Sequence, residues 1–151
     1  MMRWMIGIAF LLLAGPALAE AIGPATVIDG DTLEVAGQRF DLFGIDAPEI
    51  GQPCTRNGRE LDCGVIARSQ LMDITAAATV VCRRLADGTA RCFSGTYDIG
   101  RGMVYAGWAL ADPEKGAAFR PVERDSRAAS RGLWRGVRFE MPWVWRARVD
   151  Q

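Results

Sequence analysis

The sequence predicts an α+β domain, mainly β, with five strands and about three helices. Two observations lead to this fold class. Short apolar runs rich in β-branched residues alternate with Asp-Gly and proline turn signals. Other segments repeat apolar or small residues at helical spacing instead. The chain shows no internal repeat, linker or low-complexity segment, so we expect one domain.

The first three strands surround two acidic turns. Asp29-Gly30 separates the apolar runs ATVI and TLEV, and a DG pair tolerates the positive φ of a tight hairpin turn. A further apolar run covers residues 40–45 and stops at Asp46-Ala47-Pro48-Glu49, because proline cannot continue a sheet ladder. If these strands pair, the acids of both turns gather at one end of a sheet.

Two more strands and three helices complete the expected fold. Residues 79–84 and 89–93 predict strands joined by a second DG turn. The helices are expected at residues 65–78, 99–109 and 121–132. Asp98 suits the N-cap of the second helix, Pro121 the first turn of the third, and Gly132 the position just past its end.

The N-terminus has the pattern of an export signal. A charged MMR start precedes an apolar run over residues 4–15 and the cleavage pattern Ala17-Leu18-Ala19. We therefore predict a signal peptide at 1–19, a periplasmic or secreted protein, and no membrane span after cleavage. A retained N-terminal anchor is the alternative, although the run is short for a bilayer. Removing 19 of 151 residues leaves 132, enough for one domain with a core.

We expect a domain over residues 20–135 and a docked tail rich in Trp and Arg over 136–151. Trp143 and Trp145 lie two apart in this tail, which predicts either an extended strip packed on the domain or an exposed base-stacking platform. Packing is the better interpretation, because aromatic side chains usually bury large areas.

The charge balance gives no basic surplus. Cleavage of the signal removes Arg3 and no acid, so the formal net charge falls from 0 to −1. Nonspecific nucleic-acid binders usually carry excess positive charge, so affinity for nucleic acid would need local clustering or a bound metal. Arginines do cluster late in the chain, and we interpret the cluster as a solvated surface. Its members are Arg120, Arg124, Arg127, Arg131, Arg135, Arg138, Arg146 and Arg148.

All four cysteines lie in the exported part, which suggests two disulfides. No pair has C-x-x-C spacing and the chain has no histidine, so a zinc site is not indicated. Three connectivities are open. Of these we choose Cys54 with Cys63 and Cys82 with Cys92, each closing a loop of about ten residues worth roughly 2.5 to 3 kcal/mol in the chain-entropy model.

The four acids Asp29, Asp31, Asp46 and Glu49 are the candidate functional group. Gathered carboxylates repel, so they must be solvated, protonated or neutralised by a cation, and we prefer the cation. Without histidine the ligands are hard oxygens, which suits Ca²⁺ or Mg²⁺. The alternative is two unrelated, solvated turns.

The motifs IDGDT and LFGIDAPE together resemble the signature of the staphylococcal nuclease (thermonuclease) family. DIGRGMVYAGWALA and SRAASRGLW are similar to the later helical segments of that family, so the resemblance runs from residue 25 to 134. It implies a five-stranded OB-fold barrel with helices, in an exported, disulfide-containing branch. It also implies hydrolysis of DNA and RNA phosphodiesters with Ca²⁺, Mg²⁺ being the less expected ion.

The resemblance also implies roles for individual residues. By motif position, Asp31 and Asp46 match the metal ligands and Glu49 matches the general base. Asp29 is the accompanying acid of the turn, and Thr32 lies beside the site. A carboxylate within hydrogen-bond reach can orient an attacking water, which fits the role of Glu49.

Both arginine positions of the family pattern are different here. The position before LFGIDAPE is Asp41, and the later D-x-Y-G-R segment is replaced by CRRLADGTARC. Losing one preorganised donor to a transition-state oxyanion costs roughly 3 to 4 kcal/mol. Arg39 is a tentative substitute, because it lies two residues before Asp41 on the same strand face. Arg83, Arg84 and Arg91 could approach from neighbouring strands.

Two functions from different classes follow. The first is an exported Ca²⁺-dependent nuclease acting on single-stranded or denatured nucleic acid, weakened by loss of the family arginines. The second is a catalytically degenerate OB-fold domain that binds a divalent cation or an envelope partner. The sequence does not define a preference for DNA or RNA, end or internal cleavage, the biological substrate or the oligomeric state.

Overall fold

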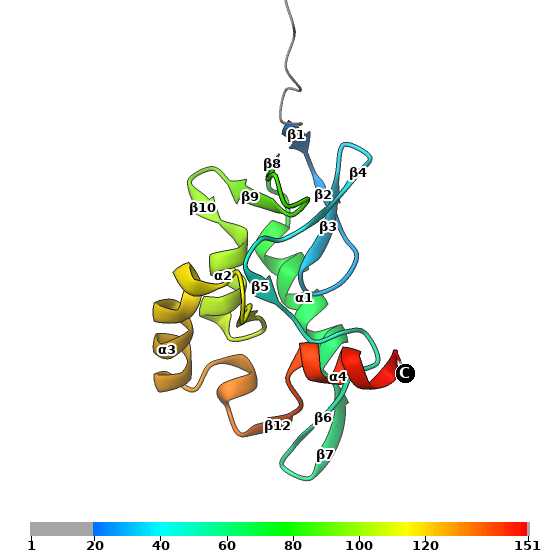
Figure 1. Ribbon diagram of the computed structural model, residues 1–151, viewed down its shortest axis with the longest axis vertical. Helices are drawn as coiled ribbons and strands as arrows, with labels where there is room; N and C mark the ends of the chain where they lie inside the picture. The colour runs from blue at the N-terminus through cyan, green and yellow to red at the C-terminus, as the bar shows by residue number, and fades with distance from the viewer. Residues whose placement is uncertain (1–19, 151) are drawn as a thin grey trace, which may run out of the picture.

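The computed structural model describes residues 20–150, so the predicted signal peptide at 1–19 lies outside the described residues (Figure 1). The described chain is mixed α+β and mostly strands, with four α-helices and twelve short strands. This agrees with the predicted class, although the expectation of about three helices missed the last one. No helix within residues 20–150 is long and apolar enough to cross a membrane.

The elements alternate along the chain. The strands are β1 (Glu20–Gly23), β2 (Ala25–Val27), β3 (Thr32–Val35), β4 (Gln38–Asp41), β5 (Ile45–Asp46), β6 (Pro53–Arg56), β7 (Arg59–Asp62), β8 (Val80–Arg84), β9 (Ala90–Ser94), β10 (Tyr97–Asp98), β11 (Leu110–Ala111) and β12 (Val137–Phe139). The α-helices are α1 (Cys63–Thr75), α2 (Ile99–Ala106), α3 (Arg120–Ala128) and α4 (Pro142–Val149).

The described strands form four antiparallel sheets, ordered β1-β8-β9-β10, β2-β3-β4, β12-β6-β7 and β11-β5. The consecutive strands β1 and β2 connect the first two sheets, because β1 pairs with β8 and β2 pairs with β3. An isolated bridge between Leu42 and Ala90 links the same two sheets again. The residues do not form a closed barrel within 20–150, so the five-stranded OB barrel stays a prediction.

Two hydrophobic clusters hold these sheets together. The larger lies between the first two sheets and helices α1 and α2, and includes Leu33, Phe40 and Leu71. The smaller lies under β12, β6 and β7, where Leu110 and Leu133 are buried and several aromatic rings pack against them. These rings are Trp108, Trp134, Phe139 and Trp143. Trp143 thus packs against the smaller cluster.

Local signals identified only part of the elements, because five strands were expected and twelve short strands are described within residues 20–150, with β1, β6, β7, β10, β11 and β12 not foreseen. The predicted helices correspond to α1, α2 and α3, and the Asp98 carboxylate caps α2 by accepting the Arg101 N–H at 3.0 Å. Pro121 stands in the first turn of α3. Both chosen disulfides are present, Cys54–Cys63 and Cys82–Cys92. The tail, however, is not an extended strip, because Trp143 and Trp145 lie in the helix α4.

Gly30 is required for a different reason from the one predicted. It has no positive φ, and the residues of positive φ in the β2-β3-β4 sheet are instead Ala36 and Gly37 in the turn between β3 and β4, with φ of 51° and 73°. A Cβ on Gly30 would lie 2.7 Å from the Ala47 Cβ and 2.8 Å from the Ala67 Cβ. The glycine therefore lets the IDGDT turn press against the DAPE turn and α1, which brings the two acidic turns together.

Candidate functional site

A polar pocket of about 160 Å³ lies where the two acidic turns meet. Its lining residues come from the strand ends around β4 and β5, the loop after β11, and α4. They are Asp31, Asp41, Leu42, Gly44, Ile45, Asp46, Thr89, Asp112, Lys115 and Arg146. Asp31 and Asp46 therefore share one pocket, as does Asp41. The other predicted site residues are not among its lining residues, namely Asp29, Thr32, Arg39 and Glu49.

Hydrogen bonds orient the Asp31 carboxylate. The Ala47 N–H donates to its Oδ2 at 2.7 Å, which ties the IDGDT turn to the DAPE turn. The Asp29 carboxylate accepts the Asp31 N–H at 3.1 Å, so Asp29 shapes the turn. The Thr32 hydroxyl lies 3.3 Å from an oxygen of Asp31 and 3.3 Å from an oxygen of Asp41, and can donate to either.

Burial makes both pocket aspartates retain protons more strongly than usual. Desolvation raises the pKa of Asp31 well above its ordinary value, the Ala47 N–H opposes this, and the charges of Asp29 and Asp46 raise it further. Desolvation also raises the pKa of Asp46, opposed by Arg146 and reinforced by Glu49 and Asp112. An excess of buried acid of this kind favours a bound cation.

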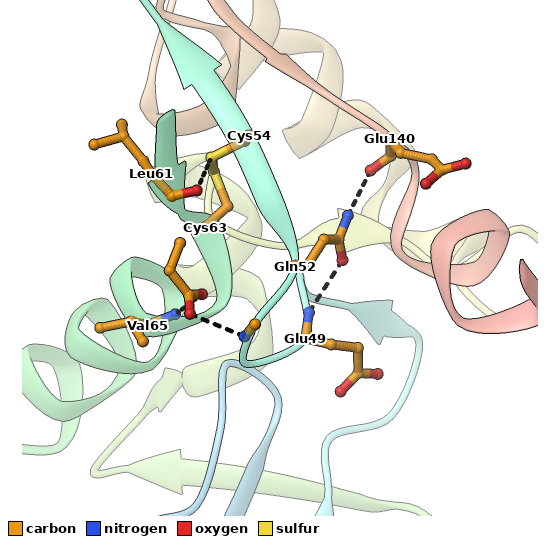
Figure 2. Close-up of a disulfide and its surroundings, with 9 residues drawn as sticks. Glu49, Gln52, Cys54, Leu61, Cys63, Val65 and Glu140 are labelled. Atoms are coloured by element: carbon orange, nitrogen blue, oxygen red, sulfur yellow. Dashed lines mark hydrogen bonds between the residues drawn. A yellow bond between two sulfur atoms is a disulfide. The ribbon is translucent and has the colours of Figure 1, made fainter. Parts of the chain in front are cut away.

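The Glu49 backbone is fixed by its surroundings (Figure 2). Its N–H donates to the Gln52 Oε1 at 3.1 Å, and its carbonyl accepts the Gln52 N–H at 2.9 Å. The start of α1 packs directly behind it: a Cβ on Gly64 would lie 1.9 Å from the Glu49 carbonyl oxygen. Only glycine fits at position 64, so the backbone of α1 packs directly against the Glu49 loop.

The guanidinium of Arg146, on α4, forms ion pairs with two of the predicted site acids, Asp46 and Glu49. Its Nη2 lies 2.7 Å from the Asp46 Oδ2 and its Nη1 lies 3.4 Å from the Asp46 Oδ1. The same Nη1 pairs with the Glu49 Oε1. These carboxylates raise the pKa of Arg146, so the group stays charged. Arg146 is thus a positively charged residue of the site itself. The interpretation of the late arginines as a solvated surface is wrong for this residue.

Gln52 connects the Glu49 loop with the start of α4. Its side chain is fully buried, with 0% exposed. While its Oε1 accepts the Glu49 N–H, its Nε2 donates to the Glu140 carbonyl at 2.8 Å, two residues before α4 (Figure 2). One side chain therefore positions both Glu49 and the helix that carries Arg146. The sequence carried no signal for this role, because its partner is 88 residues away.

The arginines proposed as substitutes are engaged elsewhere. Arg39 and Asp41 share a strand face, as expected, and pair at 3.7 Å with side chains 61% and 65% exposed. Arg84 donates to the Arg39 carbonyl at 2.9 Å, and Arg91 pairs with Asp98. Arg83 pairs with Glu20 at 3.4 Å. These four guanidinia are not among the lining residues of the pocket.

The pocket fits a hard cation only in part. Within residues 20–150, no group of three or more His, Cys, Asp or Glu side chains could hold a metal ion. Asp31 and Asp46 offer two carboxylates in one polar pocket, the oxygen donors that Ca²⁺ prefers. Because Ca²⁺ takes six to eight oxygens, water and substrate oxygens would have to supply the rest.

The fold and this acidic pocket define a small α+β domain with distant similarity to staphylococcal-like nucleases. The chain is 29% identical over 110 residues to the probable staphylococcal-like nuclease CAN3 of Oryza sativa subsp. japonica. The match covers 72% of this chain but only 28% of the rice protein. No family model matches the chain.

A second relative is matched over more of its own length. The chain is 31% identical over 128 residues to the succinoglycan biosynthesis protein ExoI of Rhizobium meliloti (strain 1021), covering 79% of this chain and 67% of that protein. The chain therefore belongs to the family of this succinoglycan biosynthesis protein.

Proposed function

We propose that the protein is an exported, Ca²⁺-dependent nuclease that hydrolyses phosphodiester bonds of single-stranded or denatured nucleic acid. The observation that carries this proposal is that two separate turns meet in the fold. Asp31 and Asp46 line one pocket, and Arg146 pairs with both Asp46 and Glu49. The distant similarity to a staphylococcal-like nuclease supports the same activity.

Asp31 and Asp46 would hold the ion, and the Ala47 N–H and the Thr32 hydroxyl orient the Asp31 carboxylate. Bound there, Ca²⁺ would neutralise phosphate charge and act as a Lewis acid. Glu49 would orient the attacking water and accept its proton, because it is the partly exposed carboxylate beside the pair, with 31% of its side chain exposed. Gln52 and Gly64 keep its backbone in place.

Other features support export and fold type. Two disulfides suit an oxidising compartment, which agrees with the signal-like N-terminus and a periplasmic or secreted location. We further propose that the two linked sheets form an OB-type barrel, joined at the β1–β2 segment and at the Leu42–Ala90 bridge.

A second candidate function is a non-hydrolytic domain that binds a divalent cation or an envelope partner. The observation in its favour is that Arg146 already neutralises Asp46 and Glu49, so the pair can be a structural one. Asp41 also stands where the resemblance leads us to expect an arginine. The family relative named for succinoglycan biosynthesis favours a role in the envelope.

Digestion of single-stranded DNA by the purified mature protein separates the two candidates. We expect cleavage with Ca²⁺ and none with a chelator. Glu49→Gln is expected to slow cleavage by about 10²- to 10⁴-fold, the usual contribution of a general base. Glu60→Gln, an exposed glutamate on β7, is the matched control and should cleave normally. If calorimetry shows that the wild-type protein binds Ca²⁺ but no cleavage is detected, the second candidate function, a non-hydrolytic binding domain, is favoured.

A further inference from the structure

We propose that Arg146 is the substrate-contacting cation of this site and that it has two positions in the working cycle. In the free protein it is the counter-ion of Asp46 and Glu49. Once a divalent cation binds at Asp31 and Asp46, its guanidinium turns to the anionic oxygens of the bound phosphodiester. This inference rests on the proposed nuclease function.

The geometry of the guanidinium suits this exchange. Asp46 is buried, with 6% of its side chain exposed, whereas Arg146 is 42% exposed. The contacts with Asp46 and Glu49 use its Nη1 and Nη2, so the end of the guanidinium meets the acids while part of the side chain stays exposed. Arginine presents five N–H donors in a fixed fork, which matches phosphate oxygens.

In the free protein, Arg146 holds both groups that the chemistry needs. Its two terminal nitrogens hold Asp46, a proposed metal ligand, and one of them also holds Glu49, the proposed base. A divalent ion carries twice the charge of a guanidinium and would compete for Asp46 at close range. Loading the site therefore requires Arg146 to give up at least its contact with Asp46.

The helix keeps the released side chain near the pocket. Strand β12, just before α4, pairs with β6, and the Gln52 side chain holds the Glu140 carbonyl at 2.8 Å. With its backbone anchored in this way, a guanidinium displaced from Asp46 remains within side-chain reach of a ligand bound in the pocket.

The remaining cation of the pocket cannot replace it. Lys115 lines the pocket but pairs with Asp87 at 2.9 Å. Arg39, the sequence-based candidate, rests on Asp41. Arg146 is therefore the arginine that the fold brings to the acids, and it comes from a helix outside both motif regions.

Arg146→Gln tests the proposal, with Arg148→Gln as the matched control on the same helix. Three quantities are measured on the mature protein: Ca²⁺ affinity by calorimetry, affinity for a phosphorothioate single-stranded oligonucleotide in Ca²⁺ by fluorescence anisotropy, and the rate of DNA cleavage. For Arg146→Gln we expect Ca²⁺ to bind about 3- to 10-fold tighter, because an internal competitor is gone. Oligonucleotide affinity should fall about tenfold and cleavage about 10²- to 10³-fold. Arg148→Gln should match wild type.

Arg146→Lys controls for folding damage, since it keeps the charge but loses the fork. We expect near-wild-type thermal unfolding and partial recovery of oligonucleotide binding. Unchanged Ca²⁺ affinity in Arg146→Gln would overturn the counter-ion position. Tighter Ca²⁺ binding with undiminished oligonucleotide affinity would overturn the substrate position. A wild-type protein that neither binds Ca²⁺ nor cleaves would instead overturn the nuclease function itself, and this inference with it.

Discussion

Two regions meet at the pocket, and they are built in different ways. The acidic region, residues 29–49, consists of short strands and two turns, and local hydrogen bonds place its carboxylates. The basic region, residues 137–149, consists of β12 and α4, and it reaches the pocket through long-range contacts alone. The comparison shows that the acids and their counter-charge have separate structural origins, about 100 residues apart, and each can be disturbed without the other.

Gly64→Ala should disturb the acidic region most. An added Cβ would lie 1.9 Å from the Glu49 carbonyl oxygen and 2.4 Å from the Ile50 N, both backbone atoms that cannot move aside without shifting the loop. We expect unfolding free energy to fall by more than about 3 kcal/mol, the upper end for overpacking. Urea unfolding measures this, and Val65→Ala, an exposed position next in the helix, should change little. A stable Gly64→Ala protein would mean that α1 does not support Glu49.

Gln52→Leu should uncouple the two regions. It removes the partners of the Glu49 N–H and the Glu140 carbonyl, and unsatisfied buried groups of this kind cost about 1 to 3 kcal/mol each. Both bonds are only partly buried, so we take the lower end for each group and expect a total loss of about 2 kcal/mol. Amide hydrogen exchange should accelerate in α4 more than in α2. Gln38→Leu, on the exposed face of β4, is the control. Equal protection of α4 in both variants would argue against a coupling role for Gln52.

Asp31→Asn should raise the free energy of unfolding at neutral pH, whereas the two preceding substitutions lower it. Because the pKa of Asp31 is raised above its ordinary 3.8, the folded protein binds this proton more tightly than the unfolded chain does. Its stabilising contribution is complete below pH 3.8 and is lost as pH rises through the folded pKa. At neutral pH in chelator the asparagine variant should therefore have a higher free energy of unfolding than the wild-type protein. Urea unfolding at pH 4 to 8 measures the difference, and a stability loss at pH 7 would contradict it.

The smallest expected effect concerns Asp87 and Lys115 at the rim of the pocket. The Thr89 hydroxyl and Lys115 lower the pKa of Asp87 to about 2, so its stabilising contribution is present above its ordinary 3.8 and is lost as pH falls through 2. Lys115→Gln should raise the Asp87 pKa toward its ordinary value, which a carboxyl NMR titration would show. The Thr89 hydroxyl bond at 2.6 Å should preserve part of the shift. An unchanged titration would mean that Lys115 has little influence.

The acidic region was largely predictable because its signals are local. The DG and DAPE turns act over a few residues, and the strands next to them, β2 to β5, followed from these turns. Outside this region, equally local signals gave the Asp98 cap and the two disulfides.

Gly132 was wrongly expected just past the end of the third helix, because α3 ends at Ala128 and Gly132 begins a short 3₁₀ helix. Another local error was Gly30. It was interpreted through backbone conformation, whereas its actual constraint is the Cβ atoms of Ala47 and Ala67, which only the folded chain brings near.

The basic region was not predictable by the same reasoning. The segment PWVWRARV has apolar and charged residues all round a helix, so periodicity gave no sign of α4. Arg146 looked like one more member of an arginine-rich surface. Its pairing with Asp46 spans 100 residues of chain, and nothing in the composition of either segment marks the other as its partner.

The Cys54–Cys63 disulfide ties β6 to the first residue of α1, and β6 in turn supports β12 and the helix behind it. The position of Arg146 therefore depends on this disulfide, whereas the turns that hold Asp31 and Asp46 contain neither of its cysteines. We expect a newly made chain with reduced thiols to lack both disulfides, and with them a firmly held Arg146 and a fixed Glu49 loop. If the protein is a nuclease, the need for disulfide formation would keep it inactive and so protect the nucleic acids of the producing cell until the chain has left the reducing compartment.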